Sequence, residues 1–469
     1  MAARTEPDRP ALVQLKPFLQ PFPYGRNGLQ SWAAQYALAT PSLKAQVEKD
    51  GGIKDSQPYG EIWLGSTHEN GPCFVEGKNQ SLRELIQLDP EYYLGPKLLA
   101  DEQMSSQYKH NLPYLFKVLS FDKPLPLQCH PDKKLGGKLM EDEKRRQGKN
   151  EDFVDSNAKP EVGVALSPFT AFVGFRPVEQ LSAILRGTPE LQELFKDETL
   201  QTFYRVAGSS PSDADAKAAI RTLFYEAVNA SADKVKSIVP KLRERIAHMG
   251  ADSVFGAANA FTAKGEANAS SESEAEAMAR AFEISVKTYG EEDVGTITAL
   301  ALMNVLRMRA GEGAWIQADD LHAYVEGDII ECMANSDNMV AHGLGTEEQG
   351  GISTFVEMLT YRHLPADQLL VSHEDKWQKG RQGLTRLYHV PIAEFDLLRV
   401  SLPTARDEKL KPLDGPLCLV VTEGTVDVSA GDESLKLSRG QAAFVRAGVD
   451  VSFTNAGAQA AEVWGAFYQ

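Results

Sequence analysis

The chain has 469 residues, of which 42% are hydrophobic and 24% are charged. These proportions are those of a soluble globular protein, and the length predicts about two to four domains. The formal net charge is −16, from 49 basic and 65 acidic side chains. A charge of this sign disfavours a polyanionic partner such as DNA. It does not exclude a small phosphorylated metabolite, because a few Lys or Arg side chains could attract one locally.

The N-terminal segment and the cysteines indicate a cytoplasmic location. Residues 1–17 lack the uninterrupted apolar core of a secretory signal, and no run of about 18 apolar residues occurs in the chain. The cysteines have no paired spacing, which favours reduced thiols over disulfides or a zinc finger. They are Cys73, Cys129, Cys332 and Cys418. We therefore expect a cytoplasmic protein without membrane or nucleic-acid partners.

The first third of the chain has the pattern of β-strands. From about Pro21 to Pro177, short β-branched and aromatic runs are broken by Gly, Pro and Asn. YLFKVLSF (residues 114–121) and PEVGVAL (residues 160–166) are typical of such strands. This part of the chain therefore predicts a β-rich domain.

After Pro177 the apolar spacing becomes helical. Leu191, Leu194 and Phe195 share one helix face, and Thr188 and Pro189 stand in cap and first-turn positions before them. The pattern predicts helices, with interruptions, to about residue 309. A helical block would then interrupt a β domain.

Strand patterns return beyond Gly311. In GAWIQADDLHAYVEGDIIECMA, Gly327 and Asp328 predict a turn between two apolar stretches. Residues 417–468 show short alternating strands separated by Gly-containing turns, as in a sandwich or jelly roll. That last region has no His, and no Cys after Cys418, so we expect a structural rather than metal-binding role.

Four polar residues on predicted strands are candidates for one metal site. Gln128 and His130 are two positions apart and would project from the same strand face. Glu161 shares a face with Gly163 and Ala165, small residues that would leave room in front of its carboxylate. His322 lies at the start of the returning β segment.

One carboxylate, two imidazoles and an amide oxygen suit Zn²⁺ with an open position for water or substrate, and such a site would act as a Lewis acid. On spacing alone, however, a Gln-x-His pair more often lies on a surface strand, and a Glu after Pro is usually a solvated strand start. Additional segments favour the metal site.

Six segments, in order along nearly the whole chain, resemble those of type I mannose-6-phosphate isomerases. They are PYGRNG (23–28), PYGEIWLG (58–65), QCHPDK (128–133), AKPE (158–161), HAYVEGDIIECMANSDN (322–338) and VPIAEFDLLRV (390–400). The resemblance implies one Zn²⁺ per chain, with Gln128, His130, Glu161 and His322 as its ligands. It also implies interconversion of mannose 6-phosphate and fructose 6-phosphate, which feeds GDP-mannose synthesis.

The same resemblance implies the fold: a mainly β cupin or jelly-roll catalytic domain with an inserted α-helical domain and a C-terminal second jelly roll. This agrees with the order of elements predicted above. The expected domains are residues 1–177 with 296–372, residues 178–295, and residues 373–469. The sequence does not fix the oligomeric state, and we expect a monomer or weak oligomer.

Three further residues match family positions in the active site, namely Lys159, Glu331 and Asp337. Lys159 could neutralise charge or act as an acid, and Asp337 is the preferred candidate for proton transfer. The ordinary alternatives are a solvated lysine beside a proline, and an aspartate that caps a turn.

The chain departs from the family pattern close to these positions. The family's HKPE is AKPE here, so Ala158 replaces a histidine. The family's SDNVxRAG is SDNMVAHG here, so Ala341 replaces an arginine and His342 follows it. The family's T-P-K is also lost, at residues 345–347.

Three hypotheses therefore stay open, of which the first is favoured because all four ligands are retained. They are a divergent mannose-6-phosphate isomerase, an isomerase of another sugar phosphate, and a catalytically impaired zinc protein that binds a sugar phosphate.

Overall fold

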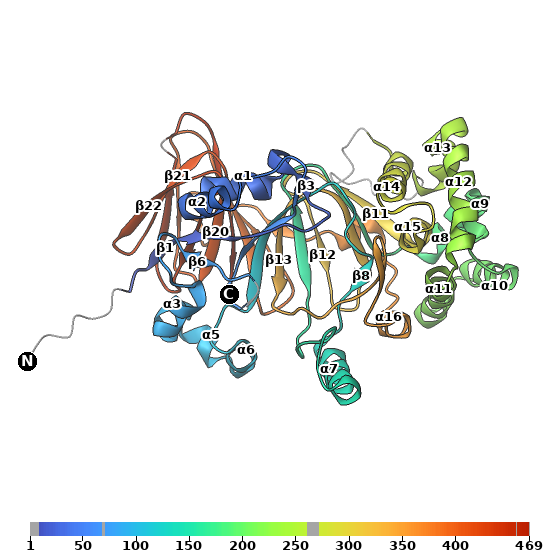
Figure 1. Ribbon diagram of the computed structural model, residues 1–469, viewed down its shortest axis with the longest axis horizontal. Helices are drawn as coiled ribbons and strands as arrows, with labels where there is room; N and C mark the ends of the chain where they lie inside the picture. Colours follow the sequence, from blue (N-terminus) through green and yellow to red (C-terminus); the bar gives the residue numbers. More distant parts are fainter. Residues whose placement is uncertain (1–8, 68–70, 260–271, 456, 469) are drawn as a thin grey trace, which may run out of the picture. The chain divides into compact units, whose positions relative to one another are not determined.

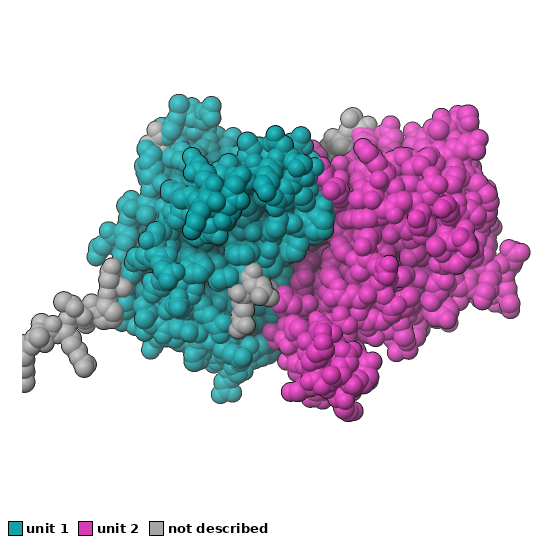
Figure 2. Space-filling view, viewed as in Figure 1, with its two compact units in different colours: residues 1–120, 330–335, 371–469 teal, residues 121–329, 336–370 magenta. Residues whose placement is uncertain are grey.

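The computed structural model describes residues 9–67, 71–259, 272–455 and 457–468. The chain forms two compact units, which Figure 2 shows in different colours. Unit 1 holds residues 1–120, 330–335 and 371–469, and unit 2 holds residues 121–329 and 336–370. The three-domain division predicted from the sequence is finer than these two units and stays a prediction.

The strands of unit 1 come from both ends of the chain (Figure 1). From the N-terminal part come β1 (Leu12–Lys16), β2 (Phe18–Gln20), β3 (Arg26–Asn27), β4 (Pro58–Tyr59), β5 (Glu61–Leu64), β6 (Phe74–Val75) and β7 (Tyr114–Phe121). From the C-terminal part come β16 (His373–Glu374), β17 (Thr385–Tyr388), β18 (Asp396–Leu402), β19 (Asp407–Leu410), β20 (Leu417–Glu423), β21 (Thr425–Ala430), β22 (Glu433–Ser438), β23 (Ala442–Val445), β24 (Val451–Thr454) and β25 (Ala461–Phe467).

An antiparallel eight-stranded sheet joins these two groups in the order β16-β17-β18-β25-β20-β23-β1-β6. The N-terminal β1 pairs with β23, with Leu12 opposite Val445. A four-stranded sheet follows the order β19-β24-β21-β22, and apolar side chains of both sheets form one buried core that includes Leu419, Val428 and Phe453. The N-terminal strands therefore complete a sheet made mostly by C-terminal ones.

Unit 1 also contains short helices that the strand patterns did not predict. They are the 3-10 helix Gly28–Gln30, α1 (Trp32–Ala39), α2 (Pro41–Lys49), α3 (Leu82–Leu88), α4 (Pro90–Leu94), α5 (Pro96–Ala100) and α6 (Glu102–Tyr108). Three of them begin with a proline, whose missing N–H and fixed φ suit a first helical turn. A capping box between Ser81 and Glu84 starts α3. Helices this short have too few turns to show a clear helical period in the sequence.

Unit 2 combines strands with a long helical segment. Its strands are β8 (Gln128–Cys129), β9 (Glu161–Ala165), β10 (Phe169–Phe175), β11 (Met303–Met308), β12 (Gly313–Ile316), the first part of β13 (His322–Ala334), β14 (Val340–Gly343) and β15 (Thr346–Gln349). Its helices are α7 (Lys133–Gln147), α8 (Val178–Gly187), α9 (Pro189–Gln192), α10 (Asp197–Ala207), α11 (Asp213–Val228), α12 (Ala232–Met249), α13 (Ala251–Asn259), α14 (Glu274–Tyr289), α15 (Val294–Leu302), α16 (Ile352–Met358) and the 3-10 helix Ala366–Leu369.

Helices α8 to α15 lie between β10 and β11 in the chain and gather together in Figure 1. Because α15 runs directly into β11, and β11 pairs with β10, the helical segment begins and ends on neighbouring strands. The helices and strands share one apolar core, in which Phe175, Phe224 and Tyr361 are in ring contact. The helices predicted after Pro177 are confirmed as far as Leu302, but the predicted end near residue 309 is wrong, because Met303–Met308 form strand β11.

The chain as a whole has an excess of helix over strand, with 37% helix and 29% strand, whereas mainly β character was predicted for the catalytic domain only. The excess comes from the short helices of unit 1, from α7 and from the long segment α8 to α15. In the part of the chain that the structure describes, no helix is both long and apolar enough to cross a membrane.

The turn predicted at Gly327 and Asp328 is also wrong, because both residues lie inside the single strand β13. Gly327 has a φ of 150°, where a Cβ atom would lie 3.1 Å from the Phe169 Cα. The Ser167 hydroxyl donates to the Asp328 carboxylate (2.8 Å), and the Asp328 amide donates back to that hydroxyl (3.0 Å). The glycine thus allows close strand packing and a shift in β10–β13 pairing between Thr170 and Ala171.

Replacing Gly327 tests this packing. We expect Gly327→Val to lower the free energy of unfolding by about 2–4 kcal/mol, because the new side chain meets the Phe169 backbone at an unfavourable φ. Chemical denaturation followed by circular dichroism measures the change. Gly256→Ala is the control, since a Cβ atom there meets no atom within 4 Å. Equal stability of the two variants would contradict this account.

Candidate metal centre

Strand pairing in unit 2 brings the predicted metal ligands together. Strand β8 pairs with β13 so that Gln128 lies directly opposite His322. Directly opposed residues of an antiparallel pair project to the same face. His130 follows β8, and Glu161 begins β9. Three segments far apart in the sequence therefore contribute to one place.

His130, Glu161 and His322 form a buried cluster whose possible ligand atoms all lie within 4.8 Å of one another. The His130 Nε2 atom is 3.4 Å from Glu161 Oε1, and the His322 Nε2 atom is 3.3 Å from Glu161 Oε2. Both imidazoles are 0% exposed and Glu161 is 2% exposed. The carboxylate thus lies between two imidazole nitrogens, away from water.

Backbone carbonyls fix the tautomer of both rings. His130 Nδ1 lies 2.9 Å from the Asn338 carbonyl oxygen, and His322 Nδ1 lies 3.2 Å from the Asp320 carbonyl oxygen. A carbonyl only accepts, so each Nδ1 carries the proton and donates it. In a neutral ring this leaves a lone pair on each Nε2.

Within the described residues, neither Nε2 atom has a hydrogen-bond partner. Two lone pairs that face a carboxylate at this distance are unfavourable unless a cation lies between them. Imidazole nitrogens and a carboxylate oxygen are ligands that Zn²⁺ prefers, and a backbone acceptor on the other ring nitrogen is the usual support. The geometry and the donor set therefore fit a divalent metal ion.

Lys159 adds a positive charge at the edge of the cluster, with its Nζ atom 3.1 Å from Glu161 Oε1. Burial alone would raise the pKa of the Glu161 carboxyl, but Lys159, His130 and His322 together hold that pKa well below its usual range. Burial, followed by Lys159, holds the pKa of His130 well below its usual range. A neutral His130 beside an ionised Glu161 is the protonation state that metal binding requires.

The space that the sequence predicted in front of Glu161 is filled. A Cβ atom at Gly163 would lie 3.2 Å from the Tyr324 hydroxyl, so the small residue accommodates that ring rather than an open cavity. Tyr324 is two positions from His322 and 1% exposed. The expectation of open space at Gly163 is therefore wrong.

The three predicted catalytic residues have different surroundings. Lys159 contacts the cluster, as described above. Asp337 is exposed, and its backbone amide donates to Asp155 Oδ2 at 3.2 Å. Glu331 belongs to unit 1, where it is 3% exposed. No catalytic role is tested by these positions, and each stays a prediction.

Glu331 belongs to a second buried group of charges, in unit 1. Lys117 Nζ lies 3.1 Å from Glu331 Oε2 and 3.5 Å from Glu61 Oε2. Glu61 also accepts hydrogen bonds from the Tyr24 hydroxyl and the Trp63 indole. The sequence analysis missed Lys117 and Glu61. The available signal was Lys117 itself, the one charged side chain of β7, a strand with every residue buried.

The positions that depart from the family pattern lie on and beside these strands. Ala341 is 1% exposed and pairs with Gln128 across β14 and β8, so position 341 faces the same side as Gln128. The amide of His342 donates to the Leu127 carbonyl at 3.0 Å, and its Nδ1 contacts the Glu347 carbonyl in the β14–β15 hairpin. His342 is therefore held by its own hairpin, and Ala158 is buried.

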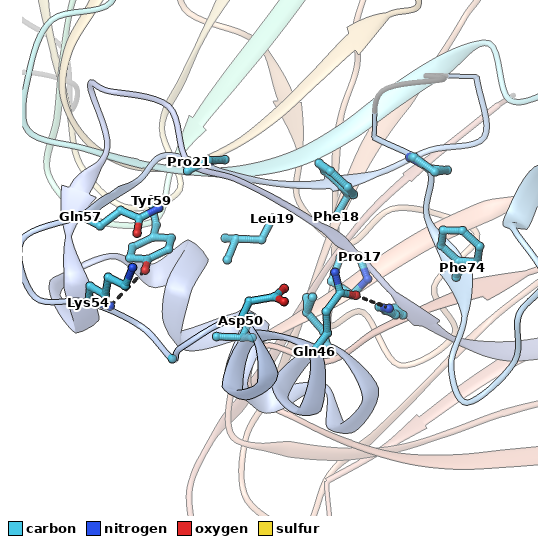
Figure 3. A pocket seen from close by; sticks show the side chains of 15 residues that line it. Pro17, Phe18, Leu19, Pro21, Gln46, Asp50, Lys54, Gln57, Tyr59 and Phe74 are labelled. Atoms are coloured by element: carbon cyan, nitrogen blue, oxygen red, sulfur yellow. Dashed lines mark hydrogen bonds between the residues drawn. The ribbon is translucent and has the colours of Figure 1, made fainter.

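A separate pocket of about 310 Å³ lies in unit 1 (Figure 3). Leu19, Leu43 and Val47 contribute apolar walls, and the Lys54 backbone amide donates to the Tyr59 hydroxyl at 3.1 Å. None of the seven predicted site residues, all of which the structure describes, lines this pocket. It is distinct from the candidate metal centre.

Comparison with known proteins gives consistent matches. Residues 12–178 match the family model for the catalytic domain of type I phosphomannose isomerase. The mannose-6-phosphate isomerase of Cryptococcus neoformans is 33% identical over 463 residues, which are 95% of this chain and 96% of the relative. That of Saccharomyces cerevisiae is 31% identical over 445 residues, with 92% and 93% covered.

Solved structures share the fold across the whole chain. A point mutant of phosphomannose isomerase from Salmonella typhimurium superposes with a TM-score of 0.73 and 21% identity, covering 98% of this chain and 100% of its own. A zinc-bound mannose 6-phosphate isomerase superposes with a TM-score of 0.71 and 21% identity, over the same shares. At this identity the likeness establishes the fold, which is of the cupin type.

Removing one imidazole tests the metal centre. We expect the purified chain to carry about one metal ion, and His322→Ala to retain about a tenth of that or less, because the loss of one of the four predicted ligands leaves an incomplete ligand set in a buried site. Elemental analysis by mass spectrometry measures both. His342→Ala is the matched control and should keep its metal. Full metal content in His322→Ala would refute the assignment.

Proposed function

The chain belongs to the type I phosphomannose isomerase family, and from this premise we propose that it interconverts mannose 6-phosphate and fructose 6-phosphate. The reaction would take place at a Zn²⁺ ion held by His130, Glu161 and His322. Gln128, directly opposite His322, would supply the fourth ligand. The proposal therefore combines the substrate of the family with the buried cluster of His130, Glu161 and His322 in this chain.

One observation carries the metal part of the proposal, namely the two unpartnered Nε2 atoms that face the same carboxylate. A purely structural ion pair would need a proton on one ring. Burial and Lys159 oppose that proton on His130. A divalent cation satisfies both nitrogens and the carboxylate together.

The isomerisation moves a proton between C1 and C2 and places negative charge on a sugar oxygen. A bound Zn²⁺ would supply the Lewis acidity that stabilises this charge. Lys159 would hold a second positive charge beside the same carboxylate and could donate a hydrogen bond to a sugar oxygen. Its contact with Glu161 pre-orients the ammonium group.

The remaining roles are assigned by family position. We propose that Asp337 transfers the proton between C1 and C2. It is the exposed carboxylate of the turn that leads to Asn338, so it remains accessible to substrate. For Glu331, whose Oε2 lies 3.1 Å from Lys117 Nζ, the family position implies an active-site role, and we retain that role as a proposal.

In this role the protein would link fructose 6-phosphate to GDP-mannose synthesis. The proposal retains the sequence-based expectations of a cytoplasmic monomer or weak oligomer that has no membrane or nucleic-acid partner. The predicted inserted helical domain and C-terminal jelly roll belong to the same proposal. The position of α8 to α15 between paired strands supports the first of these domains.

A second candidate function is favoured by the alanines at positions 158 and 341. Without the family's histidine and arginine, the chain could act on another sugar phosphate, or bind a sugar phosphate without efficient turnover. Loss of a cation at a site where charge develops commonly costs about 3 kcal/mol, or about 100-fold in rate. Both alternatives keep the metal centre and differ in turnover.

The deciding experiment is a coupled assay for fructose 6-phosphate formed from mannose 6-phosphate, using protein of known zinc content. We expect turnover that is lost when a chelator removes the metal and restored by added Zn²⁺. A panel of other aldose phosphates should be slower. Absent turnover by zinc-loaded protein, with mannose 6-phosphate still bound in calorimetry, would favour the binding function instead.

Restoring the lost side chains tests the role of the alanines. Ala341→Arg combined with Ala158→His should raise kcat/KM about tenfold or more, because a guanidinium returns to the face of the sheet that carries Gln128. Steady-state kinetics with mannose 6-phosphate measures the gain.

Ala341→Met with Ala158→His is the control, because it adds a comparable volume at the buried position 341 without charge. No gain in the arginine variant, with folding and zinc retained, would point to a different substrate.

A further inference from the structure

Asn338 connects two arms of the candidate metal centre. They are the segment that carries His130 (the His130 arm) and the segment that carries Glu161 (the Glu161 arm). It is 0% exposed and lies between β13 and β14, just before the position of Ala341. Its backbone carbonyl oxygen accepts the hydrogen bond from His130 Nδ1 at 2.9 Å. The orientation of one imidazole therefore depends on where this peptide lies.

The Asn338 carboxamide binds a different segment of the chain, residues 154–157. Its Oδ1 accepts from the Val154 amide at 3.0 Å, and its Nδ2 donates to the carbonyl oxygens of Asp155 (2.7 Å) and Asn157 (3.3 Å). This segment leads directly into Lys159 and Glu161. The Asn338 side chain thus fixes the position of the segment that precedes Glu161.

Asp155 also accepts hydrogen bonds from the residues that precede Asn338. Its carboxylate accepts from the Ser336 hydroxyl (2.9 Å) and from the Asp337 amide (3.2 Å), so residues 336–338 and the 154–157 segment are bonded in both directions. Gly136 on α7 allows this close packing, because a Cβ atom there would lie 3.2 Å from Asn338 Nδ2. The connection is centred on the buried Asn338 and is hydrogen-bonded on each side.

We propose that Asn338 is a positioning residue of the metal centre, which couples the His130 arm to the Glu161 arm. The Asn338 carbonyl sets the tautomer and orientation of the His130 ring. The Asn338 carboxamide fixes the position of that carbonyl relative to Glu161. Removing the carboxamide leaves residues 336–338 tied to Asp155 by the Ser336 and Asp337 hydrogen bonds alone, so that the separation of His130 Nε2 and the Glu161 carboxylate is less tightly fixed. The inference rests on the zinc part of the proposed function and adds a residue that does not touch the ion.

The test measures metal affinity without any substrate. Full-length Asn338→Ala should bind Zn²⁺ about 10- to 100-fold more weakly than the unmodified chain, the range expected when support for a metal-binding histidine is lost. Competition with a chromophoric chelator gives the affinity. The visible absorption of the Co²⁺-loaded protein reports ligand geometry, and its bands should shift in the variant.

Asn455→Ala provides the matched control in unit 1. Asn455 is 1% exposed, and its carboxamide likewise bonds loop carbonyls, those of Leu402 (3.0 Å) and Gln459 (2.8 Å). Both variants should lower the unfolding temperature of metal-free protein, but only Asn338→Ala should change the Zn²⁺ affinity and the Co²⁺ spectrum. If Asn338→Ala does not fold, Asn338→Asp is the deciding variant. It keeps the Oδ1 acceptor but loses the hydrogen bonds that Nδ2 donates. We expect it to weaken Zn²⁺ binding about tenfold.

Unchanged Zn²⁺ affinity and Co²⁺ spectrum in a folded Asn338 variant would overturn this inference and leave the proposed function intact. The same holds if Asn455→Ala weakens binding equally. Failure of the unmodified chain to bind Zn²⁺ would overturn both the inference and the zinc part of the proposed function.

Discussion

Two hydrogen bonds from imidazole nitrogens to backbone carbonyls constrain the whole candidate centre. Once His130 and His322 donate through Nδ1, both Nε2 lone pairs face Glu161. Within the described residues, no other side chain or backbone group hydrogen-bonds to these nitrogens. A buried acceptor without a partner costs about 1–3 kcal/mol, and a cation between the rings and the carboxylate would remove that cost. The strand register, the position of Lys159 and the turn at Asn338 all serve this geometry.

The buried charged groups of the two units have different partners. In unit 2, Lys159 and the two imidazoles offset the burial of a single carboxylate. In unit 1, one ammonium, that of Lys117 on the fully buried strand β7, contacts the carboxylates of Glu61 and Glu331. Burying such groups costs several kcal/mol per ion unless they are paired, which makes an accidental origin of either group improbable. Ionisable groups in such surroundings cluster at functional sites and also occur in structural ion pairs.

Retention of a metal centre and retention of activity are separate questions in this chain. All four predicted ligands are kept, whereas Ala158 and Ala341 replace two polar residues of the family pattern. Ala341 lies opposite Gln128, so the substitution removes a cation from the face that carries the ligands without disturbing the strands that position them. Its neighbour His342 cannot compensate in this conformation, because its ring contacts the hairpin carbonyl of Glu347. The metal-binding scaffold can therefore persist while the rate of the reaction changes.

Local pattern in the sequence was enough for much of the fold and for the residues of the candidate metal centre. Alternation placed Gln128 and His130 on one face, apolar spacing predicted the helices after Pro177, and the ordered family segments identified Glu161 and His322. Local pattern failed where contacts between residues far apart in the sequence determine the structure. Gly327 suggested a turn, yet packing against Phe169 keeps it inside β13. Lys117 lay in an apolar run with no sign of its two carboxylate partners.

The sequence by itself determined which residues can bind a metal, because ligand chemistry belongs to the side chain and the two-residue period of a strand is local. Only the tertiary structure decided that His322 pairs with Gln128, which carbonyl holds each imidazole, and that Asn338 ties the His130 arm to the Glu161 arm. Strand register and the direction of a carbonyl depend on contacts between segments far apart in the chain, and no local pattern encodes them.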